Sequence, residues 1–297
     1  MTYFSKENIK NLAKEYGFSP SKGLGQNFLV DENVVRKVIE AAEIKDNDIV
    51  LEIGPGLGAL TRGLIDEAKQ VVAVEKDHKM VKILKNLFSE AKNLEIMESD
   101  IRKFSPKKDF LGYKAVGSLP FYLTAPVIRR FLEAVDVKPQ QMVFVVQKEV
   151  AQRICAQPPQ SKRINPLLHP SLPLGKMSIL AVSVQFYAEA KIISYISKDS
   201  FWPRPKVDAA IIRMIPFAKP NLAKEKTELF FKIVKAGFSQ PRKQLPNNLS
   251  KKLELDRAET ERWLAENSIE PKRRAETLEV KDWINLTKSF KIKQYED

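Results

Sequence analysis

The chain has 297 residues, and its 50 Lys and Arg outnumber its 37 Asp and Glu, giving a formal net charge of +13 at pH 7. Such an excess of cations indicates a polyanionic partner, most often nucleic acid, although a generally basic soluble surface would give the same count. One cysteine excludes an intrachain disulfide, and two histidines leave little from which to build the usual Cys/His zinc sites or a Ser-His-Asp triad.

The first residues carry no secretory pattern, and no apolar run approaches membrane-spanning length. We therefore expect a cytoplasmic protein that binds neither a membrane nor a metal. Cys155 follows a helix-like stretch and is expected to be a buried packing residue rather than a nucleophile.

In the first half of the chain, short apolar runs alternate with amphipathic stretches. Because parallel strands are joined through helices, this alternation predicts an α/β fold, a mostly parallel sheet with helices on both faces. Two β-rich runs that follow, 179–187 and 207–215, predict an antiparallel hairpin at one edge of the sheet. The predicted strands are residues 49–53, 71–74, 94–97, 114–116 and 142–146, and the predicted helices are residues 60–68, 79–88 and 124–134.

The last third of the chain has a different pattern. Pro216 and Pro220 bracket a linker, after which apolar residues recur with helical spacing among many charges. We predict a first domain over residues 1–216 and a small helical domain over residues 217–297. The stretch 157–176 contains five prolines and is expected to be an irregular surface loop, functional or mobile.

A glycine-rich turn follows the first predicted strand. In Glu52-Ile53-Gly54-Pro55-Gly56-Leu57-Gly58 the glycines permit a tight turn and let a ligand approach the backbone closely. Glu75 ends the next strand, 21 residues after Gly54, which is the spacing at which a carboxylate accepts hydrogen bonds from ribose hydroxyls. These features fit a dinucleotide or S-adenosylmethionine.

Two details favour S-adenosylmethionine over a dinucleotide. The glycines are spaced G-x-G-x-G rather than G-x-G-x-x-G, and Glu52 precedes them by two residues, where a carboxylate can hold the amino-acid end of the cofactor indirectly. After a further strand, Asp100 can accept a hydrogen bond from the adenine amine of the cofactor while Ile101 packs on its ring. The plainer interpretation, three ordinary strand-end turns, accounts less well for this order and spacing.

A candidate base pocket follows the fourth predicted strand, at Gly117-Ser118-Leu119-Pro120-Phe121. The amine of adenine is a poor nucleophile, because its lone pair is delocalised into the ring. The Ser118 oxygen and the Leu119 carbonyl, held rigid by Pro120, can accept its two hydrogens and draw the nitrogen toward tetrahedral geometry. Phe121 offers a ring face to a flipped base. Strand-end turns with Ser and Pro are common, so this tetrapeptide alone is a weak signal.

With these motifs and its N-terminal run 21–31, the chain resembles the KsgA-type ribosomal RNA adenine dimethyltransferases from about Pro20 to Leu278. The resemblance implies a class I, Rossmann-like S-adenosylmethionine-dependent methyltransferase sheet with a small all-helical C-terminal domain. It implies as substrate two adjacent adenines in a hairpin near the 3′ end of small-subunit rRNA, each dimethylated on its exocyclic nitrogen. The matching motifs are residues 21–31, 52–58, Glu75, Asp100, 118–121, 201–208, 238–243 and 274–278.

The motifs and the resemblance together give three groups of candidate residues. The base pocket is formed by Ser118, Leu119, Pro120, Phe121 and, on the other face of the base, Phe201. The cofactor contacts are Gln26, Asn27, Leu29, Glu52, Gly54, Gly56, Gly58, Glu75, Lys76, Asp100, Ile101 and Ser118. The RNA contacts are Arg204, Lys206, Arg242, Lys243, Lys272 and Arg273, and those of the helical domain are expected to hold phosphates rather than read bases. The expected partner is small-subunit rRNA within a pre-assembled subunit, bound by a monomer.

Two features depart from the family pattern. Ser118 stands where the family usually has Asn, so a shorter hydroxyl replaces an amide oxygen, and the stretch 158–174 is longer than usual. Ser118 keeps open an alternative function, a ribosome-assembly or transcription factor that retains the fold and RNA binding with weakened catalysis. Glu52, Glu75 and Asp100 favour the enzyme, and the glycine spacing disfavours a nicotinamide oxidoreductase.

Overall fold

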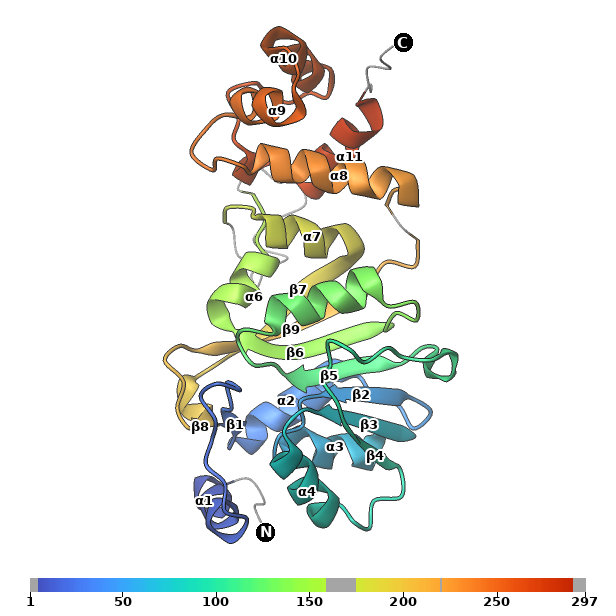
Figure 1. Ribbon diagram of the computed structural model, residues 1–297, viewed down its shortest axis with the longest axis vertical. Helices are drawn as coiled ribbons and strands as arrows, with labels where there is room; N and C mark the ends of the chain where they lie inside the picture. The colour runs from blue at the N-terminus through green and yellow to red at the C-terminus, as the bar shows by residue number, and fades with distance from the viewer. Residues whose placement is uncertain (1–4, 159–174, 220, 291–297) are drawn as a thin grey trace. The chain divides into compact units, whose positions relative to one another are not determined.

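The computed structural model describes residues 5–158, 175–219 and 221–290, and its contacts form two compact units (Figure 1). The first unit comprises residues 1–151 and 188–216, and the second comprises residues 152–187 and 217–297.

The compact units differ from the predicted domains in one segment. Residues 152–187 lie within the predicted first domain, but they belong to the same compact unit as the C-terminal helices. The functional division at residue 216 stays a prediction. Most of the expected 157–176 loop, residues 159–174, lies outside the described residues.

A seven-stranded sheet forms the centre of the first unit, with the strand order β4-β3-β2-β5-β6-β9-β7. Strands β2 to β6 are parallel, β9 is antiparallel to β6, and β7 is antiparallel to β9. The mostly parallel sheet predicted from the sequence is therefore confirmed. The strands are β2 (Ile49–Ile53), β3 (Gln70–Glu75), β4 (Leu94–Glu98), β5 (Lys114–Ser118), β6 (Gln141–Gln147), β7 (Ala188–Ile196) and β9 (Ala209–Pro216).

The predicted strand at residues 179–187 is wrong. This segment is helix α7 (Ile179–Tyr187), and the edge hairpin is formed by β7 and β9, with a register shift between Ile192 and Ser194. The sequence of α7 is apolar at nearly every position, so neither a helical nor a strand period can be read from it. Most of its side chains are buried, which is why it carries no polar face.

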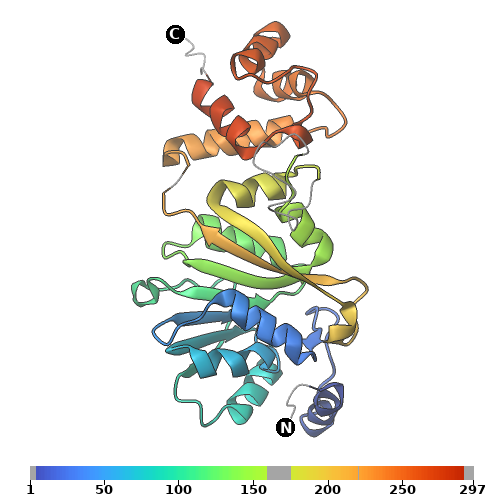
Figure 2. The same ribbon diagram turned by 180° about the vertical axis from the view of Figure 1, so that it is seen from behind.

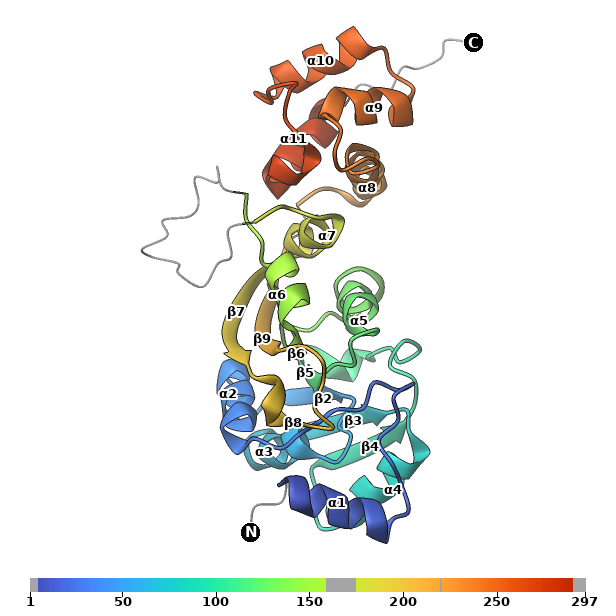
Figure 3. The same ribbon diagram turned by 90° about the vertical axis from the view of Figure 1, so that its left-hand side faces the viewer.

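Helices cover both faces of the sheet, as predicted. Figure 2 shows α2 and α3 against one face, and Figure 3 shows α2 and α5 on opposite faces. Two of the helices begin at aspartates: Asp31 accepts from Asn33 N, and Asp77 accepts from Lys79 N. The helices are α1 (Lys6–Glu15), α2 (Glu32–Ala42), α3 (Ala59–Glu67), α4 (His78–Leu87), α5 (Thr124–Arg129), its continuation Arg130–Ala134, and α6 (Lys148–Ile154); a short turn of helix spans Lys108–Phe110.

A second, two-stranded sheet joins distant parts of the first unit. Strand β1 (Phe28–Leu29) pairs antiparallel with β8 (Phe201–Trp202), which follows a short helical turn at Lys198–Ser200. The Ser200 hydroxyl also donates to Asp31, 2.9 Å away. These contacts place β1 beside Phe201, the aromatic residue that begins β8.

The second unit is helical, which confirms the helices predicted after residue 217. The stacked rings of Phe186 and Phe230, 4.2 Å apart, lie in its core with the fully buried Trp283. Cys155 is buried, and this burial raises the pKa of its thiol to about 12, so it packs as a neutral side chain. The helices are α7, α8 (Lys224–Gly237), α9 (Leu245–Leu253), α10 (Arg257–Glu266) and α11 (Val280–Ser289), with a short turn at Ala275–Thr277.

Two absences concern the part of the chain that the structure describes. None of its helices is long and apolar enough to cross a membrane. No three His, Cys, Asp or Glu side chains in these ranges are grouped so that they could hold a metal ion.

Candidate functional site

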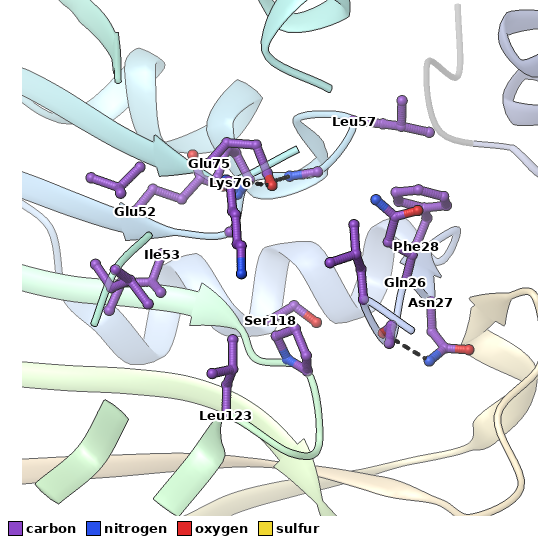
Figure 4. A pocket seen from close by; sticks show the side chains of 18 of the residues that line it. Gln26, Asn27, Phe28, Glu52, Ile53, Leu57, Glu75, Lys76, Ser118 and Leu123 are labelled. Atoms are coloured by element: carbon purple, nitrogen blue, oxygen red, sulfur yellow. Dashed lines mark hydrogen bonds between the residues drawn. The ribbon is translucent and has the colours of Figure 1, made fainter. Parts of the chain in front are cut away.

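A cavity of about 1000 Å³, counting its open mouth, lies at the carboxyl ends of β2, β3 and β5. Loops that follow parallel strands meet at this edge of a sheet, which is why ligands bind there in α/β folds. Figure 4 shows Lys76 extending across the cavity toward Ser118, with Glu52 and Glu75 on the side of Lys76 and with Gln26 and Asn27 farther to the right. Eleven of the twelve predicted cofactor residues line it: Gln26, Asn27, Leu29, Glu52, Gly54, Gly56, Glu75, Lys76, Asp100, Ile101 and Ser118.

The three glycines between β2 and α3 are required for different structural reasons. Gly54 and Gly56 have φ values of +67° and +59° and line the cavity, and a Cβ on Gly54 would point into open space. Gly58 does not line the cavity. Its φ is +89°, and a Cβ there would lie 2.4 Å from the ring of Phe88, so packing explains this glycine. We leave Gly58 out of the cofactor contacts proposed below.

Glu75 is held at the end of β3 by backbone amides. Its Oε1 accepts from Lys76 N at 2.7 Å and from Asp77 N at 2.8 Å, and its Oε2 accepts from Gly56 N at 3.1 Å. Burial raises the pKa of Glu75, and the three amide hydrogen bonds oppose that rise. Because each carboxylate oxygen can accept two hydrogen bonds, Oε2 keeps one acceptor position for a ligand hydroxyl.

Glu52 offers an acceptor atom that the protein leaves without a partner. Its Oε2 accepts from the Thr61 hydroxyl at 2.6 Å, whereas its Oε1 is buried and has no hydrogen-bond partner among the described residues. Burial raises the pKa of Glu52 to about 8. A buried acceptor without a partner is costly unless a ligand or an ordered water satisfies it.

Asp100 is the most strongly ion-paired carboxylate at the cavity. Arg102 donates to it through Nη2 (2.6 Å to Oδ2), Nε (3.0 Å to Oδ1) and its backbone amide (3.0 Å to Oδ1). Lys76 Nζ lies 3.3 Å from Oδ2. The hydrogen bonds from Arg102 lower the pKa of Asp100, so this carboxylate is ionised at neutral pH.

Gln26 lines the cavity, but its amide is already used within the protein. Its Oε1 accepts from Ser21 N at 2.8 Å, and its Nε2 donates to Asp77 Oδ2 at 2.8 Å. The side chain therefore connects the run before β1 to the start of α4. This assigns Gln26 a positioning role, which the sequence did not indicate.

A smaller cavity of about 320 Å³ adjoins the first, and it brings the predicted base-pocket residues together. Phe201 lies across from the segment that follows β5 because β8 pairs with β1. Four residues line both cavities: Gly25, Asn27, Ser118 and Pro120. The smaller cavity is lined by Gly25, Asn27, Ser118, Leu119, Pro120, Phe121, Val145, Val146, Phe201, Pro205 and Ala209.

The backbone that leads into Ser118 is fixed by close strand contact. Gly117 stands opposite Ile53 in the sheet, and a Cβ on Gly117 would lie only 2.5 Å from the Ile53 carbonyl oxygen. Any larger residue would push β5 away from β2. The Leu119 amide then donates to the Val145 carbonyl at 3.0 Å, which holds the turn in place.

Sequence reasoning missed several residues that line the larger cavity. Tyr122 and Leu123 directly follow the pocket motif and could have been found by extending it. Tyr122 lies beside Gly25, where a Cβ would lie 3.5 Å from its ring. Ile9 comes from α1, and no sequence signal marks a single apolar residue of an N-terminal helix as part of a distant cavity.

In the second unit, one backbone hydrogen bond joins two predicted RNA-contacting segments. Leu245 N donates to the Arg273 carbonyl at 3.0 Å, which places the residues just before α9 beside the loop that follows α10. Arg242, Lys243 and Lys272 are exposed there. Arg273 instead turns to its own chain and donates to Thr277 Oγ1 at 3.0 Å and to the Thr277 carbonyl.

In the first unit, the two predicted RNA contacts follow β8. Arg204 and Lys206 are both exposed. Arg204 pairs with Asp199, with Nε 2.6 Å from Oδ1.

The donor and acceptor set of the larger cavity fits S-adenosylmethionine. Glu75 offers an acceptor for ribose hydroxyls, the unpartnered Oε1 of Glu52 suits an ammonium group, and Asp100 is an ionised acceptor for an amine. Gly54 leaves room for close approach to the backbone. The adjoining smaller cavity, with two aromatic residues and the Ser118 hydroxyl, has the features of a site for a flat, polar-edged ring.

Comparison with known proteins agrees with this geometry. The family model described as ribosomal RNA adenine dimethylase matches residues 17–291. A ribosomal RNA small subunit methyltransferase A from Dehalococcoides mccartyi is 40% identical over 279 residues, covering 92% of this chain and 89% of the relative. One from Clostridium botulinum is 37% identical over 286 residues, covering 94% of this chain and 97% of the relative.

Two solved structures are similar over most of the chain. The 23S rRNA methyltransferase ErmE has a TM-score of 0.70 at 27% identity and covers 88% of this chain and 98% of its own. A dimethyladenosine transferase from Plasmodium falciparum has a TM-score of 0.68 at 25% identity and covers 87% and 95%. This chain therefore belongs to the ribosomal RNA adenine dimethylase family, which consists of S-adenosylmethionine-dependent methyltransferases.

Proposed function

We propose that this chain dimethylates the exocyclic nitrogen of two adjacent adenines in a 3′-terminal hairpin of small-subunit rRNA. The relatives at 37–40% identity are named for the small subunit, whereas the structure named for 23S rRNA is 27% identical. The observation that carries the proposal is the position of Ser118, which lines both the larger cavity and the smaller one. A side chain that lines both cavities suits a transfer between their occupants.

In this proposal the larger cavity holds S-adenosylmethionine, which supplies the methyl group. Glu75 Oε2 accepts from a ribose hydroxyl, and Asp100 accepts from the adenine amine of the cofactor. Glu52 Oε1 accepts from the amino group at the amino-acid end, directly or through a water. The backbone at Gly54 and Gly56 lies against the cofactor, because neither residue has a side chain to keep it away.

The smaller cavity then holds the target adenine, extruded from the RNA. Phe121 and Phe201 offer rings for stacking on the base. The Ser118 hydroxyl accepts one hydrogen of the target amine, and the carbonyl of Leu119 accepts the other. The Pro120 carbonyl is less suited to this, because it already accepts from Leu123 N at 2.9 Å. These contacts localise the nitrogen lone pair and aim it at the cofactor cavity.

The RNA is held outside the cavities by exposed cations. Arg242, Lys243 and Lys272 lie close together in the second unit, and Lys206 lies in the loop whose Pro205 lines the smaller cavity. We place the enzyme on a pre-assembled small subunit in the cytoplasm, acting as a monomer. Phosphate contacts of this kind set the orientation of the RNA, while the cavity selects the base.

Methyl transfer from labelled S-adenosylmethionine to unmethylated small subunits tests the proposal. Nucleoside analysis should find dimethyladenosine at two adjacent positions near the 3′ end of the rRNA. Free rRNA and large subunits serve as parallel substrates, and we expect little transfer to either. Tight binding to small subunits without any transfer would contradict the enzyme and favour the alternative function, an assembly factor that keeps the fold.

A further inference from the structure

Tyr195 lies near the end of β7, at the same edge of the sheet as the smaller cavity. Because β6 and β7 are both antiparallel to β9, they are parallel to each other and end at this edge (Figure 3). Tyr195 stands opposite Ala210 on β9, and Ala210 stands opposite Val146, which lines the smaller cavity. Neighbouring strands are about 4.8 Å apart, so Tyr195 lies about 10 Å from Val146 across the sheet.

The ring of Tyr195 is exposed and has a cation beside it. The residue is 49% exposed, and Lys148 Nζ lies 5.4 Å from the ring centroid, within the range of a cation–π interaction. Lys148 is itself held in place. Its backbone amide donates to the Asp208 carbonyl at 3.0 Å, and its ammonium lies 3.6 Å from Asp208 Oδ2.

Further cations follow Tyr195 in the sequence, in a loop that also contributes to the smaller cavity. Arg204 and Lys206 are exposed in the loop that joins β8 to β9, and Pro205 of that loop lines the cavity. A single exposed aromatic on an edge strand is ordinary. An exposed ring with a cation beside it and further exposed cations near a candidate base pocket is typical of sites for single-stranded nucleic acid, in which bases stack on aromatic side chains and cations follow the phosphates.

We propose that Tyr195 is a stacking platform for a nucleotide that flanks the target adenine, with Lys148 and Lys206 placed for the adjoining phosphates. The proposal rests on the proposed function, because the smaller cavity must hold the target base. A stacked strand advances about 3.4 Å per nucleotide, so about 10 Å corresponds to about three nucleotides, and to fewer when the strand is extended. Tyr195 therefore holds the strand beside the extruded base and contributes to RNA affinity rather than to the chemistry.

Three variants separate stacking from other effects of the edge strand. Tyr195→Ala removes the ring, Tyr195→Phe keeps it without the hydroxyl, and Ile193→Ala is a matched control, since Ile193 is 37% exposed on the same strand. We expect Tyr195→Ala to raise the concentration of unmethylated small subunits that gives half-maximal single-turnover methylation by about tenfold. Tyr195→Phe and Ile193→Ala should leave that concentration unchanged. An unchanged value for Tyr195→Ala, or an equal rise for Ile193→Ala, would overturn the platform.

A crosslink identifies the nucleotide directly. A photoreactive benzoylphenylalanine at position 195 should crosslink to rRNA within a few nucleotides of the target adenines, and a crosslink only to distant rRNA would overturn the platform. Binding of S-adenosylhomocysteine reports whether each variant is folded. If wild type bound subunits but transferred no methyl groups, the proposed function would fail. The Tyr195 proposal would still be tested, by the affinity of each variant for the subunits and by the crosslink.

Discussion

Arg102 and Asp100 form a two-point ion pair beside the larger cavity, with Nη2 2.6 Å from Oδ2 and Nε 3.0 Å from Oδ1. The Arg102 backbone amide occupies a further acceptor position on Oδ1. Arg102 does not line the cavity itself, whereas Asp100 does. The arginine therefore fixes the orientation of the carboxylate and keeps it ionised, and Lys76 Nζ is a further partner, 3.3 Å from Oδ2.

Loss of Arg102 should weaken recognition of the adenine amine of the cofactor. We expect Arg102→Ala to lower the affinity for S-adenosylhomocysteine several-fold, and Arg102→Lys to restore it only in part, because a lysine cannot make the two-point contact. Calorimetry with S-inosylhomocysteine, which has an oxygen in place of the amine, provides the contrast. Arg102→Ala should affect this analogue little, and an equal loss for both ligands would contradict the assignment.

Glu75 should be the main anchor of the ribose. Glu75→Ala removes an acceptor for hydroxyl groups, and hydrogen bonds to a charged group contribute about 1.5–3 kcal/mol each. We expect the affinity for S-adenosylhomocysteine to fall accordingly in calorimetry. A 2′-deoxy analogue should lose affinity for wild type but not for Glu75→Ala. If Glu75→Ala binds the cofactor as tightly as wild type, the ribose assignment is wrong.

Glu52 should make stability depend on pH. Its ordinary pKa of 4.5 is raised to about 8 in the folded protein, so between these values the folded state holds a proton that the unfolded state has released. The free energy of unfolding contributed by this group is therefore highest below about pH 4.5 and falls as pH rises toward 8. Glu52→Gln should gain melting temperature over wild type at about pH 8.5 but little at about pH 5. Glu95→Gln, at an exposed position, should show no such trend.

Ser118 should control the second methylation more than the first. Loss of one positioned polar group typically costs about 10²–10³-fold in rate. Ser118→Ala should therefore slow transfer with little change in cofactor affinity, and it should accumulate monomethyladenosine, since the monomethylated amine has one hydrogen left. Ser118→Asn should retain activity if the cavity accepts the longer side chain. The same rate and the same dimethyl product in wild type and Ser118→Ala would leave the contact to the Leu119 carbonyl alone.

In the second unit, the exposed cations Arg242, Lys243 and Lys272 form a basic cluster that should determine the salt dependence of RNA binding. Each cation that neutralises a phosphate steepens the fall of affinity with salt concentration. Arg242→Ala and Lys272→Ala should each reduce the slope by about one, without changing which adenines are methylated. Lys281→Ala, an exposed lysine on α11, serves as the control and should leave the slope unchanged. Slopes that stay at the wild-type value in both cluster variants would place the phosphate contacts elsewhere.

Much of the candidate site could be predicted because glycine-rich turns and acidic residues at strand ends are recognisable in the sequence. Gly54, Glu75 and Asp100 lie at or just after the ends of successive strands of a parallel sheet, and topology brings such positions to one edge. The pocket motif at Ser118 was readable for the same reason. Candidate site residues could therefore be predicted from the sequence where they lie at the ends of regular strands.

The rest depended on contacts that a sequence does not encode locally. Gln26 donates a hydrogen bond to Asp77, 51 residues away. Nothing in the sequence around Gln26 shows whether its side chain contacts a ligand or holds two segments of the protein together. Gly58 belongs to the same glycine run as Gly54, yet only the packed structure shows the Phe88 ring beside it. Helix α7 was misassigned because its residues are buried on nearly every side, which removes the periodicity on which the assignment depends.

The wall shared by the two cavities has a thermodynamic consequence. Since Gly25, Asn27, Ser118 and Pro120 border both spaces, an occupant of one space becomes part of the surface that the other presents. In the proposed function, the cofactor and the target base occupy these two spaces, so their binding is coupled. The factor by which the cofactor changes the affinity for RNA then equals the factor by which the RNA changes the affinity for the cofactor. Exchange of S-adenosylhomocysteine for S-adenosylmethionine between the first and second methylations thus changes the affinity for the RNA. This change comes while the monomethylated adenine has to stay bound.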